Sequence, residues 1–195
     1  TIVCEDWDML KERYDKIILG AGMYGLYAAG RLAEKGCRTL VIDLERQPFQ
    51  RGSYVSQARL HNGYHYPRSY TTAFKSAVYF SRFMEDFGEA CVNADFEQIY
   101  AISRAYSWTN AKQFEKFCSN LHVRCERMLT EKYFNASTVE AAFITREHSF
   151  DAGLLSRYLY GKAKEAGCEF ALGVPIREIC REDGEFVICL KDGSR

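Results

Sequence analysis

Hydrophobic residues recur along this chain with the period of a strand in some stretches and the period of a helix in others. Residues 15–45 hold an apolar run, a glycine-rich turn, an amphipathic stretch that ends at a glycine, and a second apolar run. This order predicts one βαβ unit of about thirty residues. A third strand would follow soon after Asp43 in an ordinary nicotinamide-binding sheet, but residues 46–70 carry no strand period. The pattern therefore predicts a topology that departs from simple double winding.

The rest of the chain alternates between the same two patterns. Apolar positions at i, i+3 and i+4 spacing predict a helix of about four turns from Thr71, after a Ser or Thr cap. We also expect strands at 96–104 and 138–146, and helices at 110–121 and 151–167. The last helix begins at an Asp cap and ends at Gly167. Short runs from Cys168 onward predict a strand and then a hairpin that turns at Asp183 and Gly184.

Composition narrows the class of protein. The 195 residues include 26 basic and 26 acidic side chains, so charge gives no reason to expect nucleic acid or an anionic membrane as a partner. Eight cysteines occur without a CxxC pair or a His cluster at zinc spacing, which favours reduced thiols and no metal over a disulfide framework. We see no signal peptide and no membrane-length apolar run, and expect a soluble, cytoplasmic protein.

The glycine-rich turn carries the first chemical signal. Gly20, Gly22 and Gly25 form GxGxxG between a predicted strand and a predicted helix, where backbone amides and a helix N-terminus can hold a pyrophosphate. Asp43 ends the second strand 23 residues after Gly20, at the place where a carboxylate accepts hydrogen bonds from an adenosine ribose. Spacing, helix and acid together favour dinucleotide binding over a glycine turn that only packs tightly.

Three segments resemble one family of flavoproteins. "DKIILGAGMYGLYAAGRLAEKGCRTLVID" resembles the FAD-binding start of the D-amino-acid-oxidase-like family, within the glutathione-reductase-type flavoproteins. "GSYVSQARLHNGYHYPRS" is similar to the flavin loop of glycerol-3-phosphate dehydrogenases and 2-hydroxyglutarate oxidases; the matching positions are Ser53, Ser56, His61, Gly63 and Tyr66. Residues 150–193 resemble the helix, strand and hairpin of the same family, in which one strand backbone lies beside the adenine, and this implies a contact at Ile176.

The resemblance implies FAD as the cofactor and a Rossmann-like α/β FAD-binding domain with an inserted α+β substrate domain. We expect the first part of the FAD-binding domain at 1–88, the start of the inserted domain at 89–149, and the second, incomplete part at 150–195. The positions expected to contact FAD are Gly20, Gly22, Met23, Tyr24, Gly25, Asp43, Leu44, Ser53, Ser56, Gln57, His61, Asn62, Gly63 and Ile176. A further strand and a closing C-terminal segment of the family are not found before residue 195, so the remainder of the same protein or a second chain is an expected partner.

The stretch "QARLHNGYHYPRSY" at 57–70 is then expected to be the loop that crosses the isoalloxazine. Gly63 would permit close approach to the ring. His61 would face it as an acid, a base or a polarising group, without covalent attachment, and His65 is a second candidate. Tyr64 and Tyr66 are candidates for packing under the ring.

Two arginines of this stretch add a substrate hypothesis. A guanidinium binds a carboxylate or phosphate in bidentate fashion, so Arg59 or Arg68 would suit an amino acid, a 2-hydroxy acid or a sugar phosphate. Structural roles explain both residues equally well. His122 and His148 receive no functional assignment.

These observations predict an FAD-dependent oxidoreductase that oxidises a CH–NH or CH–OH group of a small polar or anionic substrate by hydride transfer, with His61, His65 and Arg59 as candidate catalytic residues. Three alternatives stay open: an NAD-binding dehydrogenase, a flavin-dependent sugar mutase without net redox, and a binding or regulatory protein whose dinucleotide is structural.

Overall fold

The computed structural model describes residues 13–93 and 96–193, which divide into two compact units. The first unit ends at Ser56 and resumes at Ala152, and the second runs from Gln57 to Asp151. Residues 57–88 lie in the second unit, because Tyr64 and Ala73 belong to its hydrophobic core. The functional domains expected at 1–88, 89–149 and 150–195 stay predictions. We describe each unit by itself.

The expected βαβ unit is present in the first unit. It consists of β1 (Lys16–Leu19), α1 (Met23–Ala33) and β2 (Thr39–Asp43). Strand β2 lies in the middle of a parallel three-stranded sheet, between β1 and β9 (Glu169–Leu172). All of β2 up to Ile42 is buried, as the continuous apolar run of a central parallel strand predicts. Between β2 and Ser56, where the first part of this unit ends, the chain forms only a short helix, α2 (Gly52–Val55).

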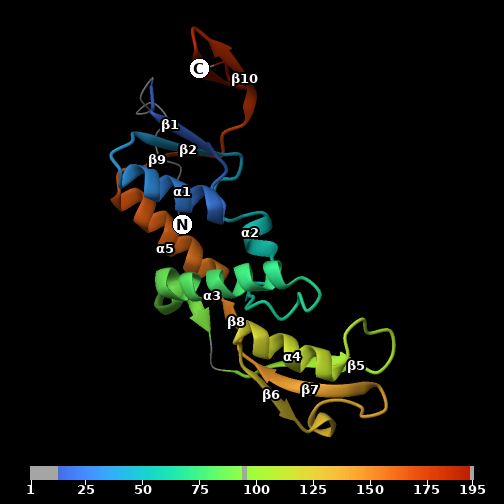
Figure 1. Ribbon diagram of the computed structural model, residues 1–195. Helices are drawn as coiled ribbons and strands as arrows, with labels where there is room; N and C mark the ends of the chain where they lie inside the picture. The colour runs from blue at the N-terminus through green and yellow to red at the C-terminus, as the bar shows by residue number, and fades with distance from the viewer. Residues whose placement is uncertain (1–12, 94–95, 194–195) are drawn as a thin grey trace. The chain divides into compact units, whose positions relative to one another are not determined.

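Helix α5 (Ala152–Glu165) packs beside α1, and both helices lie along the sheet of β1, β2 and β9 (Figure 1). The two helices approach closely at Gly30, where an added Cβ would lie 3.7 Å from the Cα of Ala163. Gly167 has φ +93° after the last turn, which confirms the glycine stop that the sequence predicts.

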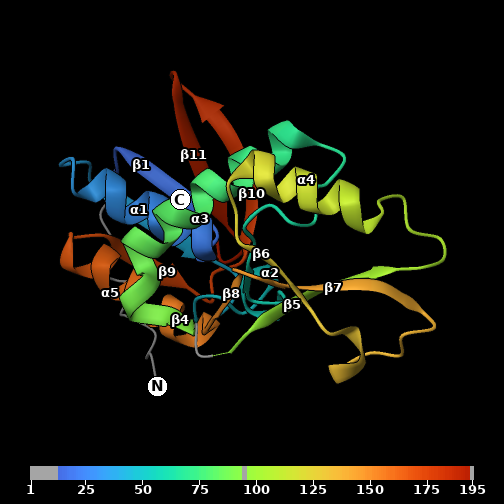
Figure 2. The same cartoon turned by 60° about the horizontal axis from the view of Figure 1, so that its bottom comes forward.

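The predicted hairpin is formed by β10 (Ile176–Glu182) and β11 (Glu185–Leu190), which are labelled together in Figure 2. Its two turn residues, Asp183 and Gly184, both have positive φ, at 49° and 88°. This is the conformation of a two-residue hairpin turn that matches strand twist. Apolar side chains of the hairpin pack on the core of the parallel sheet, namely Ile176, Ile188 and Leu190.

The second unit is built around the antiparallel sheet of β5 (Gln98–Ser103), β7 (Val139–Thr145) and β6 (Cys125–Met128), with β7 in the middle. Helix α4 (Ala111–Leu121) runs along this sheet (Figure 1). Its buried face is the one that the helical period predicts: Ala111, Phe114, Phe117, Cys118 and Leu121. Asn110 and Gln113 form a reciprocal capping box at the start of the helix.

Helix α3 (Tyr70–Cys91) is longer than the predicted four turns and contacts α4. A small second sheet has the order β3 (Arg59–Leu60), β8 (His148–Phe150) and β4 (Val92–Asn93). The 3₁₀ turn η2 (Thr130–Lys132) completes this unit. Strand β3 was not predicted, because a run of two residues is too short to show a period.

Two further sequence predictions can be compared with the structure. Among the described residues, the free thiols are those of Cys37, Cys118, Cys125, Cys168, Cys180 and Cys189. Over the ranges 13–93 and 96–193, no helix has both the length and the apolar character needed to cross a bilayer.

Candidate functional site

The glycine-rich turn lies between β1 and α1, and its three glycines are needed for three different reasons. Gly20 has φ +108°, a conformation that side chains with a Cβ rarely adopt. A Cβ on Gly25 would lie 1.9 Å from the carbonyl oxygen of Gly20, so this position holds the helix against the turn. A Cβ on Gly22 would meet only the Ser53 hydroxyl, at 3.0 Å. Because Gly22 has no Cβ, a ligand can approach the backbone of the turn at this position.

Asp43 and Ser53 face this turn from two later segments. The carboxylate of Asp43 accepts hydrogen bonds from the backbone N–H of Ala21 and from that of Glu45, the latter at 2.8 Å. The Ser53 hydroxyl accepts a hydrogen bond of 3.0 Å from the backbone N–H of Met23, the first residue of α1. The sequence predictions for Gly20, Gly22, Gly25, Asp43 and Ser53 thus fall on one cluster.

The donor set of this cluster fits a dinucleotide. The Met23 amide at the helix N-terminus meets a side-chain hydroxyl, which a phosphate oxygen can replace or join. Each Asp43 oxygen that accepts a backbone N–H keeps further lone pairs for a ribose hydroxyl. FAD would be held here by the turn, with Asp43 on the ribose and Ser53 on the pyrophosphate.

The other residues of the first unit that were predicted to contact FAD lie in surroundings that indicate no particular ligand. Tyr24 and Leu44 are exposed, at 85% and 53%. The Ser56 hydroxyl donates to the carbonyl of Ser53, at 3.5 Å. Ile176 is partly buried against the core of the parallel sheet. Their contacts with FAD stay predictions.

A second cluster, within residues 57–151, gathers around the buried carboxylate of Glu147, whose side chain is 1% exposed. Arg59 donates to Oε2 of Glu147 at 2.8 Å, and Nδ1 of His61 lies 3.3 Å from Oε1. Nε2 of His65 lies 3.7 Å from Oε2, and the two imidazole rings form an edge-to-face pair at 4.6 Å. The three residues predicted as catalytic therefore meet at one carboxylate.

Asn62 and Gly63 hold the backbone between the two histidines. The Asn62 backbone N–H donates to Oε1 of Glu147 at 3.1 Å, and its side-chain amide donates to the carbonyl of Arg146 at 3.1 Å. Gly63 has φ +94°, and a Cβ there would lie 2.7 Å from the carbonyl oxygen of Ala73. Protein packing is thus a sufficient reason for glycine on that side, and an approach to the flavin at Gly63 stays a prediction. Gln57 is exposed at the start of this unit.

Tyr64 corrects one sequence hypothesis, since it does not pack under a cofactor ring. Its side chain is fully buried among core residues such as Phe114. The hydroxyl donates to the carbonyl of Arg124 at 2.6 Å and accepts from the backbone N–H of Arg146 at 3.1 Å. Tyr64 therefore joins two distant segments of the second unit, and burial raises the pKa of its hydroxyl.

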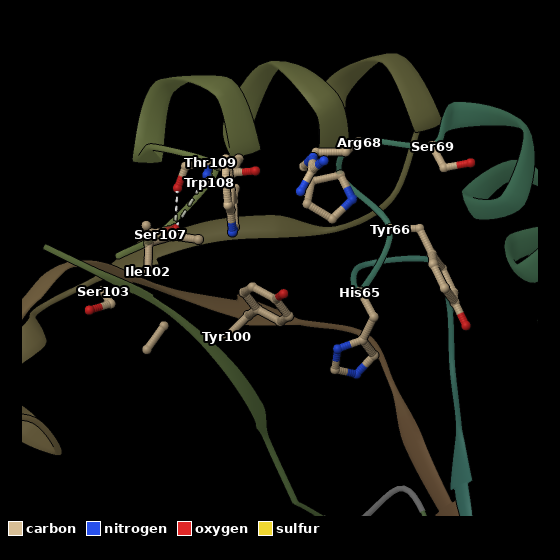
Figure 3. Close-up of a pocket in the computed structure, with 12 residues that line it drawn as sticks. His65, Tyr66, Arg68, Ser69, Tyr100, Ile102, Ser103, Ser107, Trp108 and Thr109 are labelled. Atoms are coloured by element: carbon tan, nitrogen blue, oxygen red, sulfur yellow. Dashed lines mark hydrogen bonds between the residues drawn. The ribbon is translucent and has the colours of Figure 1, made fainter. Parts of the chain in front are cut away.

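An open pocket of about 620 Å³ lies beside this cluster, between residues 65–69, residues 100–103 and residues 107–109 (Figure 3). The guanidinium of Arg68 lies over the ring of Trp108, 5.1 Å from its centroid. Tyr100 packs against His65, with ring centroids 5.6 Å apart. Within the described residues, Arg68 forms no ion pair, whereas Arg59 is bound to Glu147.

The surroundings of His65 lower its pKa on balance. Burial has the largest effect, the carboxylate of Glu147 opposes it, and His61 and Arg59 add to it. Burial and Glu147 also raise the pKa of Tyr100. A neutral imidazole at the edge of a pocket can accept a proton.

Sequence reasoning missed Glu147 as a member of this site, although Tyr100 and Trp108 had been considered as side chains that could cover it. Glu147 stands alone between two strands, and a single acid in that position carries no motif. The only available signal was that a charged residue beside an apolar strand needs a partner of opposite charge or a hydrogen-bond donor. Arg59, His61 and His65 could have been proposed as such partners for Glu147.

Comparisons with known proteins agree with this geometry. A family model described as FAD dependent oxidoreductase matches residues 15–195. The FAD-dependent monooxygenase FPY4 of Fusarium mangiferae is 35% identical over 85 residues, which are 44% of this chain and 23% of that protein.

Solved structures show the same fold at low sequence identity. NikD, an unusual amino acid oxidase essential for nikkomycin biosynthesis, has a TM-score of 0.71 at 18% identity, over 94% of this chain and 49% of NikD. The FAD-bound L-α-glycerophosphate oxidase of Mycoplasma pneumoniae has a TM-score of 0.72 at 16% identity, over 94% and 51%. The L-amino acid deaminase of Proteus vulgaris has a TM-score of 0.72 at 15% identity, over 94% and 45%. The chain spans about half the length of these structures.

Proposed function

The chain belongs to the family of FAD-dependent oxidoreductases, and from this premise we propose that the whole protein oxidises a CH–NH or CH–OH group of a small anionic substrate. FAD is the cofactor that the family and the FAD-bound neighbour support. When bound, FAD supplies the acceptor for a hydride from the substrate. The NAD alternative has no comparable support.

The observation that carries the substrate class is the guanidinium of Arg68 in the pocket of the second unit. Within the described residues this arginine has no carboxylate partner, and its guanidinium, held over the face of Trp108, can donate hydrogen bonds to a carboxylate or phosphate. Arg59 is a poorer candidate than the sequence suggested, because Glu147 already neutralises it. Relatives named for amino acid and glycerophosphate oxidation support the same class of small anions.

The chain's own residues divide the remaining work. We assign the dinucleotide to the turn of Gly20 and Gly22 with Asp43, the substrate anion to Arg68, and the proton to one of the two histidines at Glu147. Trp108 and Tyr100 would cover the apolar part of the substrate and exclude water.

The first experiment is an absorbance spectrum of the purified full-length protein, before and after denaturation, with supernatant and pellet compared. Flavin bands released into the supernatant are the expected result. Flavin retained in the pellet would instead indicate covalent attachment, with His61 as the first residue to test. A colourless protein that binds NAD would overturn the proposal.

The second experiment is anaerobic mixing with amino acids of both hands, 2-hydroxy acids and glycerol 3-phosphate. Bleaching of the flavin by one of these classes would support the proposed reaction. A flavoprotein that none of them bleaches, and that isomerises a sugar nucleotide, would be a mutase. A cytoplasmic location and a missing C-terminal partner remain separate predictions.

A further inference from the structure

One residue, His65, belongs both to the pocket and to the cluster at Glu147. Its ring lines the cavity with Arg68 and Tyr100 (Figure 3). Its Nε2 atom lies 3.7 Å from Oε2 of Glu147. His61 also contacts Glu147 but does not line this cavity. The two histidines are therefore not equivalent; the resemblance of the flanking residues had placed His61 first, whereas His65 is the one that lines the cavity.

We propose that His65 accepts the proton of the substrate in this pocket, and that Glu147 is a positioning residue that fixes the His65 ring and balances its charge. The inference rests on the proposed function. Nε2 of His65 lies at ion-pair distance from the carboxylate, which favours the tautomer with its proton on Nε2 and leaves the lone pair of Nδ1 as the acceptor.

The same two bonds break in an alcohol substrate and in an amine substrate. The O–H or N–H bond of the substrate breaks, its proton bonds to Nδ1 of His65, and its electron pair forms the C=O or C=N double bond. The neighbouring C–H bond breaks with it, and FAD, the cofactor of the family, would supply the acceptor for this hydrogen and its two bonding electrons. The imidazolium that results faces the carboxylate of Glu147.

The groups around His65 decide whether it can hold that proton. Glu147 contributes one negative charge, Arg59 contributes one positive charge, and a proton on His61 would contribute a second. Tyr100 packs on the His65 ring as a neutral phenol, because burial and Glu147 raise its pKa.

The ligand atoms of His61, His65 and Glu147 all lie within 4.8 Å of one another, which is also the spacing of a metal site. We assign a proton to this cluster because Arg59, at 2.8 Å from Glu147, already supplies the positive charge that a metal ion would bring. Tight Zn²⁺ binding that requires all three side chains would overturn this assignment.

The test compares two charge changes with opposite expected effects in the full-length protein. Glu147→Gln removes the charge that raises the His65 pKa, so the acidic limb of the kcat/KM profile should move to lower pH by about one to three units. Arg59→Gln removes a charge that lowers it, so the limb should move to higher pH. A residue that only supports the fold would not give shifts of opposite sign.

Three further variants complete the test. His65→Asn should lower kcat/KM by about a hundredfold or more. In Glu147→Asp, which keeps the negative charge, the acidic limb of the pH profile should lie close to its position in the unmodified protein. Glu126→Gln is the matched control, because Glu126 forms an exposed ion pair with Arg124 at 2.7 Å in the same unit. Its profile should equal that of the unmodified protein.

A direct readout does not depend on turnover. Histidine NMR titration, with His65 assigned by the signal missing in His65→Asn, should show the His65 pKa shift down in Glu147→Gln and up in Arg59→Gln. If the flavin is bleached by substrate but neither pKa nor profile moves, this inference fails and the proposed function stands. If His61→Asn abolishes turnover while His65→Asn retains it, His61 is the acceptor instead. If no substrate bleaches the flavin, the proposed function fails.

Discussion

The strongest test of the dinucleotide turn compares alanine at Gly25 with alanine at Gly22. At Gly25 the new Cβ would lie 1.9 Å from the carbonyl oxygen of Gly20, well inside van der Waals contact, and neither backbone group can rotate away. Helix α1 must therefore shift. Overpacking of this kind costs about 1–3 kcal/mol and sometimes more, which lowers the melting temperature by about 2–4 °C per kcal/mol in a domain of this size.

At Gly22 the new Cβ would lie 3.0 Å from the Ser53 hydroxyl, which can turn aside by rotation about χ1. The fold should therefore be nearly unaffected, with a loss of about 0.5 kcal/mol or less. FAD affinity should fall about tenfold or more, because the added methyl group stands where the pyrophosphate approaches the backbone.

The assay measures thermal unfolding of the apoprotein and FAD affinity by quenching of flavin fluorescence, for both variants in parallel. Gly25→Ala should melt several degrees lower with or without FAD, whereas Gly22→Ala should lose only the stabilisation that FAD provides. A Gly25→Ala protein that melts with the wild type would refute the packing argument. Equal FAD affinity of Gly22→Ala and wild type would refute the site.

Three further predictions follow from single side chains. Tyr64→Phe should destabilise the protein by about 1–3 kcal/mol in urea unfolding, because the Arg124 carbonyl and the Arg146 N–H lose a buried partner; Tyr133→Phe, at an exposed tyrosine, should change little. Burial lowers the pKa of His65 and of His148 below the value of 6.5 that applies to the unfolded chain, so the unfolded chain binds protons more readily than the folded protein. Stability should therefore fall as pH drops from about 7 to about 5, and a melting temperature that stays constant over that range would contradict this. Arg68→Gln should raise KM for an anionic substrate about tenfold with a smaller change in kcat, and an unchanged KM would remove Arg68 from the substrate site.

Local signals in the sequence were sufficient for most elements of the fold. The hairpin at Asp183 and Gly184 and the buried face of α4 are determined by residues close together in the chain, so period and turn chemistry predict them. The domain boundary was less predictable, because nothing local to residues 57–91 indicates that Tyr64 and Ala73 pack with α4.

The candidate site divides in the same way. The glycine turn with Asp43 is a local motif, since a strand, a tight turn and a helix N-terminus follow one another directly, and the sequence by itself determined it. The environment of His65 was decided only by the tertiary structure. Glu147 is 86 residues beyond His61 in the chain, and pairing of β8 with β3 brings it to the histidines. Glu147 becomes a neighbour of the histidines through strand pairing and burial. Neither the pairing of distant strands nor the burial of a single charge leaves a periodic pattern in the sequence.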